Sequence, residues 1–385
     1  MAKSLSGLWL RSLRSISKTQ RAQTRLMKSL LPQPARSPVA RRVKLKLKVK
    51  APAAAPKAVK PAARAAPLPG SWKLSYFSAT SPARAVSGKR MAYWLYLPSA
   101  AAAASALLPQ PLPLVVMLHG CQQTAPDFAA ATRMNQLAER KGFAVLYPQQ
   151  SAAGDAHRCW HWYQRSIQKG QGDVQLMADL ITQVQQRCGL DASRTYAAGL
   201  SAGAALATIL ALRHPQLIAA LGVHSAPVFG AADSAISGYR VMQRGAAAVY
   251  GEVAGVAARA IATARPALGG MPAIVIHGDR DAVVRRINAR QLGQQLQIIN
   301  AAAITRAEAT HKTFPARTTG RSPKRAYTTT TYYAGRKPQL VQCDISTLGH
   351  AWSGGDDSMR FSTREGPDAS LMMWTFFARH FLKTR

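Results

Sequence analysis

From about residue 70 onward, short apolar runs alternate along the chain with longer stretches of helical periodicity. The apolar runs predict strands over Ala92–Leu97, Leu114–Leu118, Phe143–Tyr147, Thr195–Ala198, Ile218–His224 and Ala273–His277. The periodic stretches predict helices over 127–141, 173–187, Ala202–Arg213 and 367–382. Because strands that alternate with helices are typical of a helix-covered parallel sheet, we expect an α/β fold over residues 70–385. Residues 301–340 are polar, basic and rich in threonine, which predicts a poorly ordered excursion with one strand near Thr328–Tyr333.

The pattern before residue 70 is different. Within residues 1–31, apolar side chains recur at helical spacing between basic ones, which predicts a basic amphipathic helix. Residues 32–69 are rich in proline, alanine and lysine and cannot build a core, so we expect a linker there. The chain shows neither a signal-peptide pattern nor an apolar run of membrane-spanning length. These absences predict a cytoplasmic protein, with a non-classical export route as the alternative.

The charge balance is strongly basic, with 51 Lys and Arg against 16 Asp and Glu, and 17 of the basic residues lie within 1–66. Such a tail favours polyanions or an anionic granule surface, whereas plain solubility is the alternative for the rest of the chain. The four cysteines are too few for a disulfide scaffold, and no CxxC or Cys/His cluster suggests a metal site.

The motif that carries most of the chemistry is Gly199-Leu200-Ser201-Ala202-Gly203. An apolar run precedes it and a helix of small residues follows, as expected for a nucleophile elbow, the strand-to-helix turn that exposes a catalytic serine in α/β-hydrolases. An ordinary tight turn is the alternative. We therefore predict an α/β-hydrolase fold with Ser201 as the nucleophile.

In this fold the acid and then the histidine follow the serine along the chain. The apolar run that ends at His277 leads into a loop with two carboxylates, of which Asp281 is the preferred acid and Asp279 the second candidate. His350 lies late in the chain in a glycine-flanked loop, so it is the candidate base. The other histidines near predicted elements, His224 among them, are expected to be structural.

An oxyanion hole needs two backbone N–H donors. The first is expected from Ala202, which follows the nucleophile, and the second from Cys121, in the loop that follows an early strand. A strand-ending turn is the alternative for the sequence His119-Gly120-Cys121. A Ser-His-Asp mechanism needs neither a metal nor an organic cofactor.

Five motifs occur in order: LHGCQQ at 118–123, CWHWYQ at 159–164, GLSAGAA at 199–205, HGDRDAVV at 277–284 and TLGHAWSGG at 347–355. Together they resemble the polyhydroxybutyrate depolymerase family of esterases over roughly residues 90–382. The resemblance implies hydrolysis of poly(3-hydroxybutyrate) or related polyesters, and it implies the same roles for Ser201, Asp281, His350 and the Cys121 region. It also implies a disulfide between Cys121 and Cys159. Members of the family are often secreted, so extracellular action is the alternative to a cytoplasmic one.

Other functions remain open at this point. Related esterases cleave feruloyl or acetyl esters, and a non-enzymatic role would make residues 1–66 a tether to a granule or to nucleic acid. Four aromatic residues are candidates to line an apolar substrate groove, with core packing as the alternative for the first three: Trp160, Trp162, Tyr163 and Trp352.

Overall fold

A computed structural model describes residues 68–78, 90–99, 111–246, 255, 270–305, 308–318 and 323–382. All of these belong to one compact unit, Leu68–Arg385. The predicted basic helix over 1–31 and all but the last two residues of the predicted linker over 32–69 lie outside the described residues.

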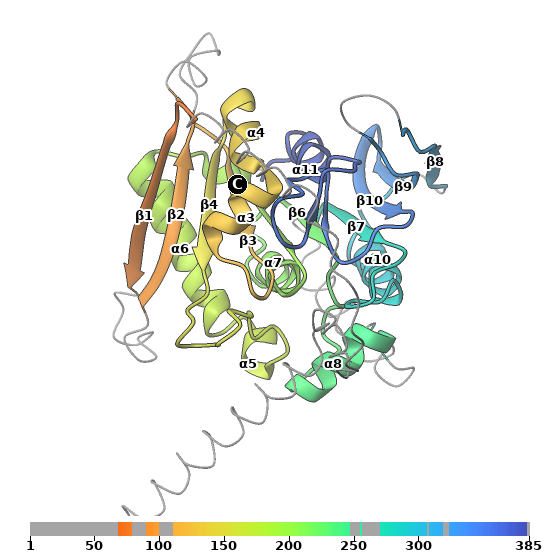
Figure 1. Cartoon of the computed structure of the whole chain (residues 1–385), viewed down its shortest axis with the longest axis horizontal. Coiled ribbons are helices and arrows are strands. Elements are labelled where there is room, and N and C mark those ends of the chain that lie inside the picture. Colours follow the sequence, from red (N-terminus) through yellow and green to blue (C-terminus); the bar gives the residue numbers. More distant parts are fainter. Residues whose placement is uncertain are drawn as a thin grey trace, which may run out of the picture. The chain divides into compact units, whose positions relative to one another are not determined.

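Ten described strands form one sheet in the order β1-β2-β4-β3-β5-β6-β7-β10-β9-β8 (Figure 1). Their bounds are β1 Ser71–Ser78, β2 Arg90–Leu97, β3 Leu114–Leu118, β4 Ala144–Gln149, β5 Thr195–Leu200, β6 Ala220–His224, β7 Ala273–Gly278, β8 Thr310–Phe314, β9 Tyr327–Ala334 and β10 Lys337–Ile345. The six strands from β4 to β10 run parallel, and the strands outside them pair antiparallel. A separate parallel pair joins β11 Trp352–Ser353 to β12 Ser362–Thr363. The mostly parallel sheet confirms the predicted α/β architecture.

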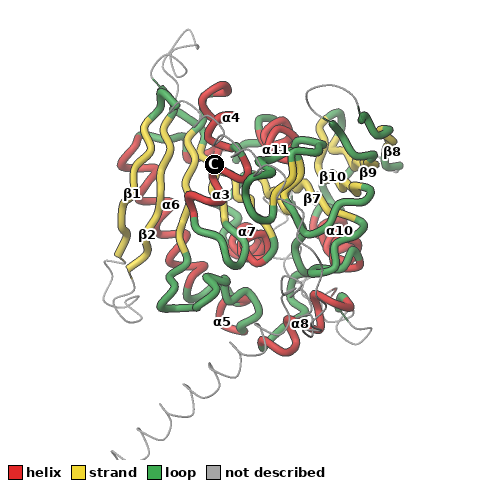
Figure 2. Tube along the Cα trace, viewed as in Figure 1, coloured by secondary structure: helices red, strands yellow, loops and turns green. Residues whose placement is uncertain are grey.

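Helices cover both faces of the sheet; Figure 2 shows the helices in red and the strands in yellow. The helices are α3 Ala125–Thr132, α4 Met134–Lys141, α5 Arg165–Gln168, α6 Asp173–Cys188, the 3-10 turn Ala192–Arg194, α7 Ala202–Arg213, α8 Ala235–Arg244, α10 Ile287–Ile299 and α11 Ala369–Phe377. Side chains alternate in direction along a strand, so β3 sends Leu114, Val116 and Leu118 to the core beneath α6, α7 and α10. Its other two residues, Val115 and Met117, pack on the opposite face against α3, α4 and α11. The buried apolar run in the sequence therefore marks a strand that is covered on both sides.

The single helix predicted over 127–141 is wrong, because the structure has two helices that meet at Arg133. Arg133 adopts the left-handed conformation, with φ of 54°. The carbonyl of Ala131, which would accept a hydrogen bond in a continuous helix, instead accepts from the N–H of Asp356 at 2.9 Å and from Ser362 Oγ at 3.0 Å. A distant loop thus ends α3, which local periodicity does not predict.

The region 301–340 also differs from the prediction of one strand, because β8, β9 and the start of β10 all lie in it. The strand β10 is part of the parallel centre of the sheet, next to β7. Gln342 and Asp344 interrupt its apolar residues, so β10 does not stand out as a continuous apolar run. The last helix is shorter than the predicted 367–382. It begins at Ala369, because the Asp368 carboxylate accepts from the N–H of Leu371 at 2.9 Å and caps the first turn, and it ends at Phe377.

Candidate active site

The carboxyl ends of neighbouring parallel strands bring the predicted site residues to one edge of the sheet. Leu200 at the end of β5 is level with His224 of β6, which is level with Ile276 of β7 and, through it, with Cys343 of β10. Ser201 follows β5 directly, whereas Asp281 and His350 lie in the loops that follow β7 and β10. This edge is where ligands bind in sheets of this kind.

Ser201 lies in a strained turn between β5 and α7. Its φ of 57° and ψ of −123° are outside the regions favoured by residues with a side chain. The Ser201 N–H donates to the carbonyl of His224 at 3.0 Å, which holds the turn against β6. A Cβ on Gly203 would lie 2.1 Å from the carbonyl oxygen of Leu118, and one on Gly199 would lie 2.6 Å from the backbone of Gly203. Both glycines of the motif are therefore required by close backbone packing.

His350 and Asp281 form a hydrogen-bonded pair, with 2.7 Å between Nδ1 of the ring and Oδ2 of the carboxylate. The other carboxylate oxygen, Oδ1, accepts from the N–H groups of Val283 at 2.9 Å and Val284 at 2.8 Å. Burial alone would raise the pKa of Asp281, but the hydrogen bonds from His350 and from the Val284 N–H lower it below the usual range. Asp281 is thus a fully buried carboxylate held in its charged form beside His350.

Asp279, the second candidate acid, has a different place. Its Oδ1 accepts from the N–H of Thr347 at 2.6 Å, and its own N–H donates to the carbonyl of Ile345. A further bond joins the N–H of Arg280 to the carbonyl of Leu348 at 3.1 Å. Asp279 therefore ties the loop after β7 to the loop after β10, and this tie brings His350 next to Asp281.

The loop after β3 lies beside the serine turn, since a Cβ on Gly120 would be 3.7 Å from Cβ of Ser201. The N–H of Gly120 donates to Gln123 Oε1, and the N–H of Gln122 donates to the carbonyl of His157 at 2.6 Å. Within the described part of the chain, the N–H of Cys121 between them has no hydrogen-bond acceptor. It is therefore a loop donor available to a ligand.

The disulfide between Cys121 and Cys159 is present, as the resemblance implies. Close to it, Trp160 donates its indole N–H to the carbonyl of His119 at 3.0 Å. The loop after β4 is thus bonded to the loop after β3 at several successive residues. These bonds hold the Cys121 N–H in place.

The aromatic residues predicted to line a groove lie in the core. Trp160 and Trp352 are 0% exposed and Trp162 is 4% exposed. Trp352 stacks on His224 and packs edge-on against Phe128. Because a fully buried indole has no surface to offer a substrate, the structure gives Trp160 and Trp352 a packing role in place of the predicted substrate-binding one.

Two buried histidines that the sequence treats as structural surround the pair of Asp281 and His350. His277 Nε2 donates to the carbonyl of Val284 at 2.8 Å and lies 3.7 Å from Oδ2 of Asp281. His224, the last residue of β6, stacks on Trp352. Burial lowers the pKa of both imidazoles, that of His224 to about 3, so both are neutral. In the sequence, their position at the ends of two apolar runs was the feature that could have placed them near the site.

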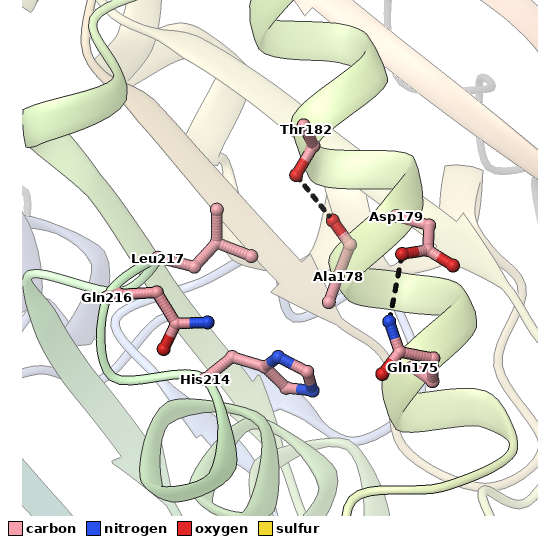
Figure 3. A pocket seen from close by; sticks show the side chains of 7 residues that line it. All are labelled: Gln175, Ala178, Asp179, Thr182, His214, Gln216 and Leu217. Carbon is pink, nitrogen blue, oxygen red and sulfur yellow. Dashed lines mark hydrogen bonds between the residues drawn. The ribbon is translucent and has the colours of Figure 1, made fainter.

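A cavity of about 340 Å³ lies elsewhere, between α6 and the segment that follows α7 (Figure 3). Figure 3 shows Gln175 and Asp179 of α6 on one side, joined by a hydrogen bond of 2.9 Å, and His214 on the other. His214 follows the C-terminus of α7, whereas Ser201 precedes its N-terminus, so the 12-residue helix separates them by about 18 Å. This cavity is not part of the site at the carboxyl edge.

No group of three or more His, Cys, Asp or Glu side chains among the described residues is arranged to hold a metal ion. No helix in the described ranges is long and apolar enough to cross a membrane.

Comparison with protein families finds a match to the esterase PHB depolymerase model over residues 91–315, more than half of the chain. This range includes Ser201 and Asp281 and ends before His350. Among curated proteins, poly(3-hydroxyalkanoate) depolymerase C of Paucimonas lemoignei is 32% identical over 139 residues, which are 36% of this chain and 33% of that protein. A probable acetylxylan esterase A of Aspergillus fumigatus is 33% identical over 114 residues, which are 29% of this chain and 30% of that protein. The chain thus aligns with about a third of the length of these relatives.

Among solved structures, the acetyl xylan esterase of Aspergillus awamori superposes with a TM-score of 0.54 at 20% identity. The match covers 72% of this chain and 94% of that one. It supports the predicted fold class, a mostly parallel sheet with helices on both faces.

Proposed function

Since the chain belongs to the esterase PHB depolymerase family, we propose that it is a carboxylic ester hydrolase with Ser201 as nucleophile, His350 as base and Asp281 as acid. The observation that carries the proposal is the 2.7 Å contact between His350 and a buried Asp281, at the sheet edge where the strained Ser201 turn also lies. A serine hydroxyl, an imidazole and a buried carboxylate are the three side-chain groups of a serine-hydrolase triad.

The proposed mechanism follows from these positions. His350 Nε2 takes the proton of Ser201 Oγ as the hydroxyl oxygen attacks the ester carbonyl. Asp281 accepts the Nδ1–H of His350, which fixes the tautomer that leaves Nε2 free and stabilises the imidazolium that forms. The imidazolium then gives its proton to the departing alcohol oxygen, and a water molecule attacks the acyl-enzyme by the same route in reverse.

The negative oxygen of the tetrahedral intermediate is bound by the N–H groups of Ala202 and Cys121. Ala202 is the first residue of α7, so its N–H lies at the positive end of the helix dipole. The Cys121 N–H is held beside Ser201 by the disulfide and by the bonds of its neighbours. Each such donor contributes on the order of 3 kcal/mol to the transition state.

For the substrate we propose the ester bonds of poly(3-hydroxybutyrate) or its oligomers, because the family description and the relative from Paucimonas lemoignei both point to hydroxyalkanoate polyesters. Acetyl esters of polysaccharides are the second candidate, supported by the acetylxylan esterase relative at comparable identity. Neither requires a cofactor. A granule or polyanion partner for residues 1–66 stays a prediction from their charge, as does a cytoplasmic location.

The decisive experiment measures hydrolysis of p-nitrophenyl butyrate, amorphous poly(3-hydroxybutyrate) and acetylated xylan by the wild type and Ser201→Ala. We expect activity on the small ester and the polyester, and loss of both in the variant. Activity on acetylated xylan in place of the polyester would keep the mechanism and change the substrate. Equal activity of the variant and the wild type would disprove the proposed nucleophile.

A further inference from the structure

His224 makes one bond to the serine turn and another to the segment that carries the proposed base. Its carbonyl oxygen accepts from the N–H of Ser201 at 3.0 Å. Its ring Nε2 lies 3.3 Å from the backbone nitrogen of Ser353, three residues after His350. A single, fully buried residue therefore contacts both elements that must meet for catalysis, through its backbone carbonyl on one side and its ring on the other.

These contacts select one tautomer of the His224 ring. The Ser353 backbone nitrogen is a donor, so Nε2 is the acceptor and carries no proton. The proton then lies on Nδ1, which donates to Ser225 Oγ at 3.1 Å. Trp352 stacks on the ring with 5.2 Å between centroids, which prevents the ring from turning out of this position. The low pKa of the buried ring keeps it in this neutral form.

The segment around His350 is held on both sides of the histidine. Before it, the carbonyl of Leu348 accepts from the N–H of Arg280. After it, the N–H of Trp352 donates to the carbonyl of Phe361, and the N–H of Ser353 donates to His224. Phe361 belongs to the same C-terminal stretch of the chain, so it does not connect this segment to the strand next to Ser201. The bond to His224 does.

We propose that His224 is a positioning residue that sets the place of His350 relative to Ser201. It acts through the acceptor Nε2, and the stacked ring alone is not sufficient. The inference rests on the proposed Ser201–His350–Asp281 triad. Because proton transfer from Ser201 depends on a narrow range of distance, a displacement of about 1 Å in the His350 segment is enough to lower turnover by about 10²-fold.

The test compares two substitutions, one that keeps a hydrogen-bond acceptor and one that keeps the stacked ring. His224→Gln retains an amide oxygen near the position of Nε2, whereas His224→Phe retains a flat ring against Trp352 and loses the acceptor. We measure kcat and KM with p-nitrophenyl butyrate per active site, counted by titration with a serine-directed phosphonate so that unfolded protein does not contribute. His380→Gln, which alters another buried histidine at the end of the chain, is the matched control.

For His224→Phe we expect kcat to fall on the order of 10²-fold with little change in KM, and for His224→Gln a loss of about tenfold or less. If packing were the whole role, the order would be reversed, and Phe at least as active as Gln would overturn the inference. Ser225→Ala supplies a second variant should His224→Phe fold poorly. It removes the acceptor of Nδ1–H, and we expect it to lower kcat severalfold, whereas wild-type kcat would count against the tautomer.

Ser201→Ala, measured in parallel, distinguishes failure of the proposed triad from failure of the proposed role of His224. Ser201-dependent activity together with a fully active His224→Phe variant would overturn only the role of His224. Activity that persists in Ser201→Ala would overturn the proposed triad and this inference with it. An effect of His380→Gln equal to that of His224→Phe would show a general sensitivity to buried histidine substitution and would also contradict the inference.

Discussion

Nδ1 of His350 lies 2.7 Å from Oδ2 of Asp281, although 69 residues separate them in the chain. The contact exists because β7 and β10 are neighbours in the sheet and because the loops that follow them are bonded to each other. Asp279 accepts from the N–H of Thr347 and so helps to join the two loops, although it does not contact His350 itself. The two carboxylates of one short loop thus have separate tasks, which can be tested separately.

Asp281→Asn should lower kcat for p-nitrophenyl butyrate by about 10³- to 10⁴-fold, because an uncharged amide neither stabilises the imidazolium nor keeps the same tautomer of His350. Asp279→Asn is the matched control, since its amide oxygen can still accept from Thr347, and we expect a loss of about tenfold or less. Steady-state kinetics with both purified variants checks this. A larger loss in Asp279→Asn than in Asp281→Asn would exchange the two roles.

Removal of the disulfide should affect both stability and turnover. In the double variant Cys121→Ser, Cys159→Ser, we expect the free energy of unfolding to fall by about 2–4 kcal/mol, because the bridge closes a loop of 38 residues. We also expect a lower kcat, by up to about 10²-fold, since the Cys121 N–H loses its support. Urea unfolding and kinetics measure the two effects.

Cys188→Ser is the control for that experiment, because Cys188 forms no disulfide and lies at the end of α6. It should retain wild-type stability and kcat. A double variant with wild-type kcat would show that Cys121 does not need the bridge to keep its position.

Gly203→Ala should destabilise the protein by at least about 3 kcal/mol, because its new Cβ would lie 2.1 Å from the carbonyl oxygen of Leu118 and the backbone would have to shift. Gly349→Ala, where a Cβ meets nothing within 4 Å, is the matched control and should remain near the wild type. Thermal unfolding midpoints of the two variants give the comparison. Similar midpoints would contradict the close packing of α7 on β3.

The buried histidines should make the fold sensitive to mild acid. Burial lowers the pKa of His119 to about 4 and that of His224 to about 3, from 6.5 in an exposed ring. Below pH 6.5 the unfolded chain therefore binds protons that the folded chain does not. The contribution of these neutral rings to the free energy of unfolding is fully present above pH 6.5. It decreases as the pH falls, by up to about 1.4 kcal/mol per pH unit for each histidine.

Urea unfolding at pH 7.0 and pH 5.0 tests this prediction in a range where the carboxylates with lowered pKa, such as Asp281, remain charged. We expect a smaller free energy of unfolding at pH 5.0. His119→Gln should reduce that difference, since the variant has one buried imidazole fewer. A free energy that is the same at both pH values would mean that these rings are not held neutral by the fold.

The sequence was sufficient for the parts of the fold and site that depend on local pattern. Continuous apolar runs located most strands of the parallel centre, and the glycines around Ser201 indicated the turn that the structure contains. The interruption at Arg133 and the strand β10 were not predicted, because a distant loop ends α3 and because β10 mixes polar with buried residues. The sequence favoured Asp281 over Asp279 as the acid but could not show which of them contacts His350, since both follow the same strand.

By itself, the sequence determined that the chain has strands and helices in alternation, and it identified the residue types that make a nucleophile, an acid and a base in that order. Only the tertiary structure decided which carboxylate lies against His350, that Trp352 is buried on His224, and that the Cys121 N–H is the donor left between two bonded neighbours. Periodicity depends on backbone geometry over a few residues, so it can be recognised in the amino-acid sequence. Contacts between loops depend on which strands become neighbours and on the hydrogen bonds their ends form, and these exist only once the sheet has assembled.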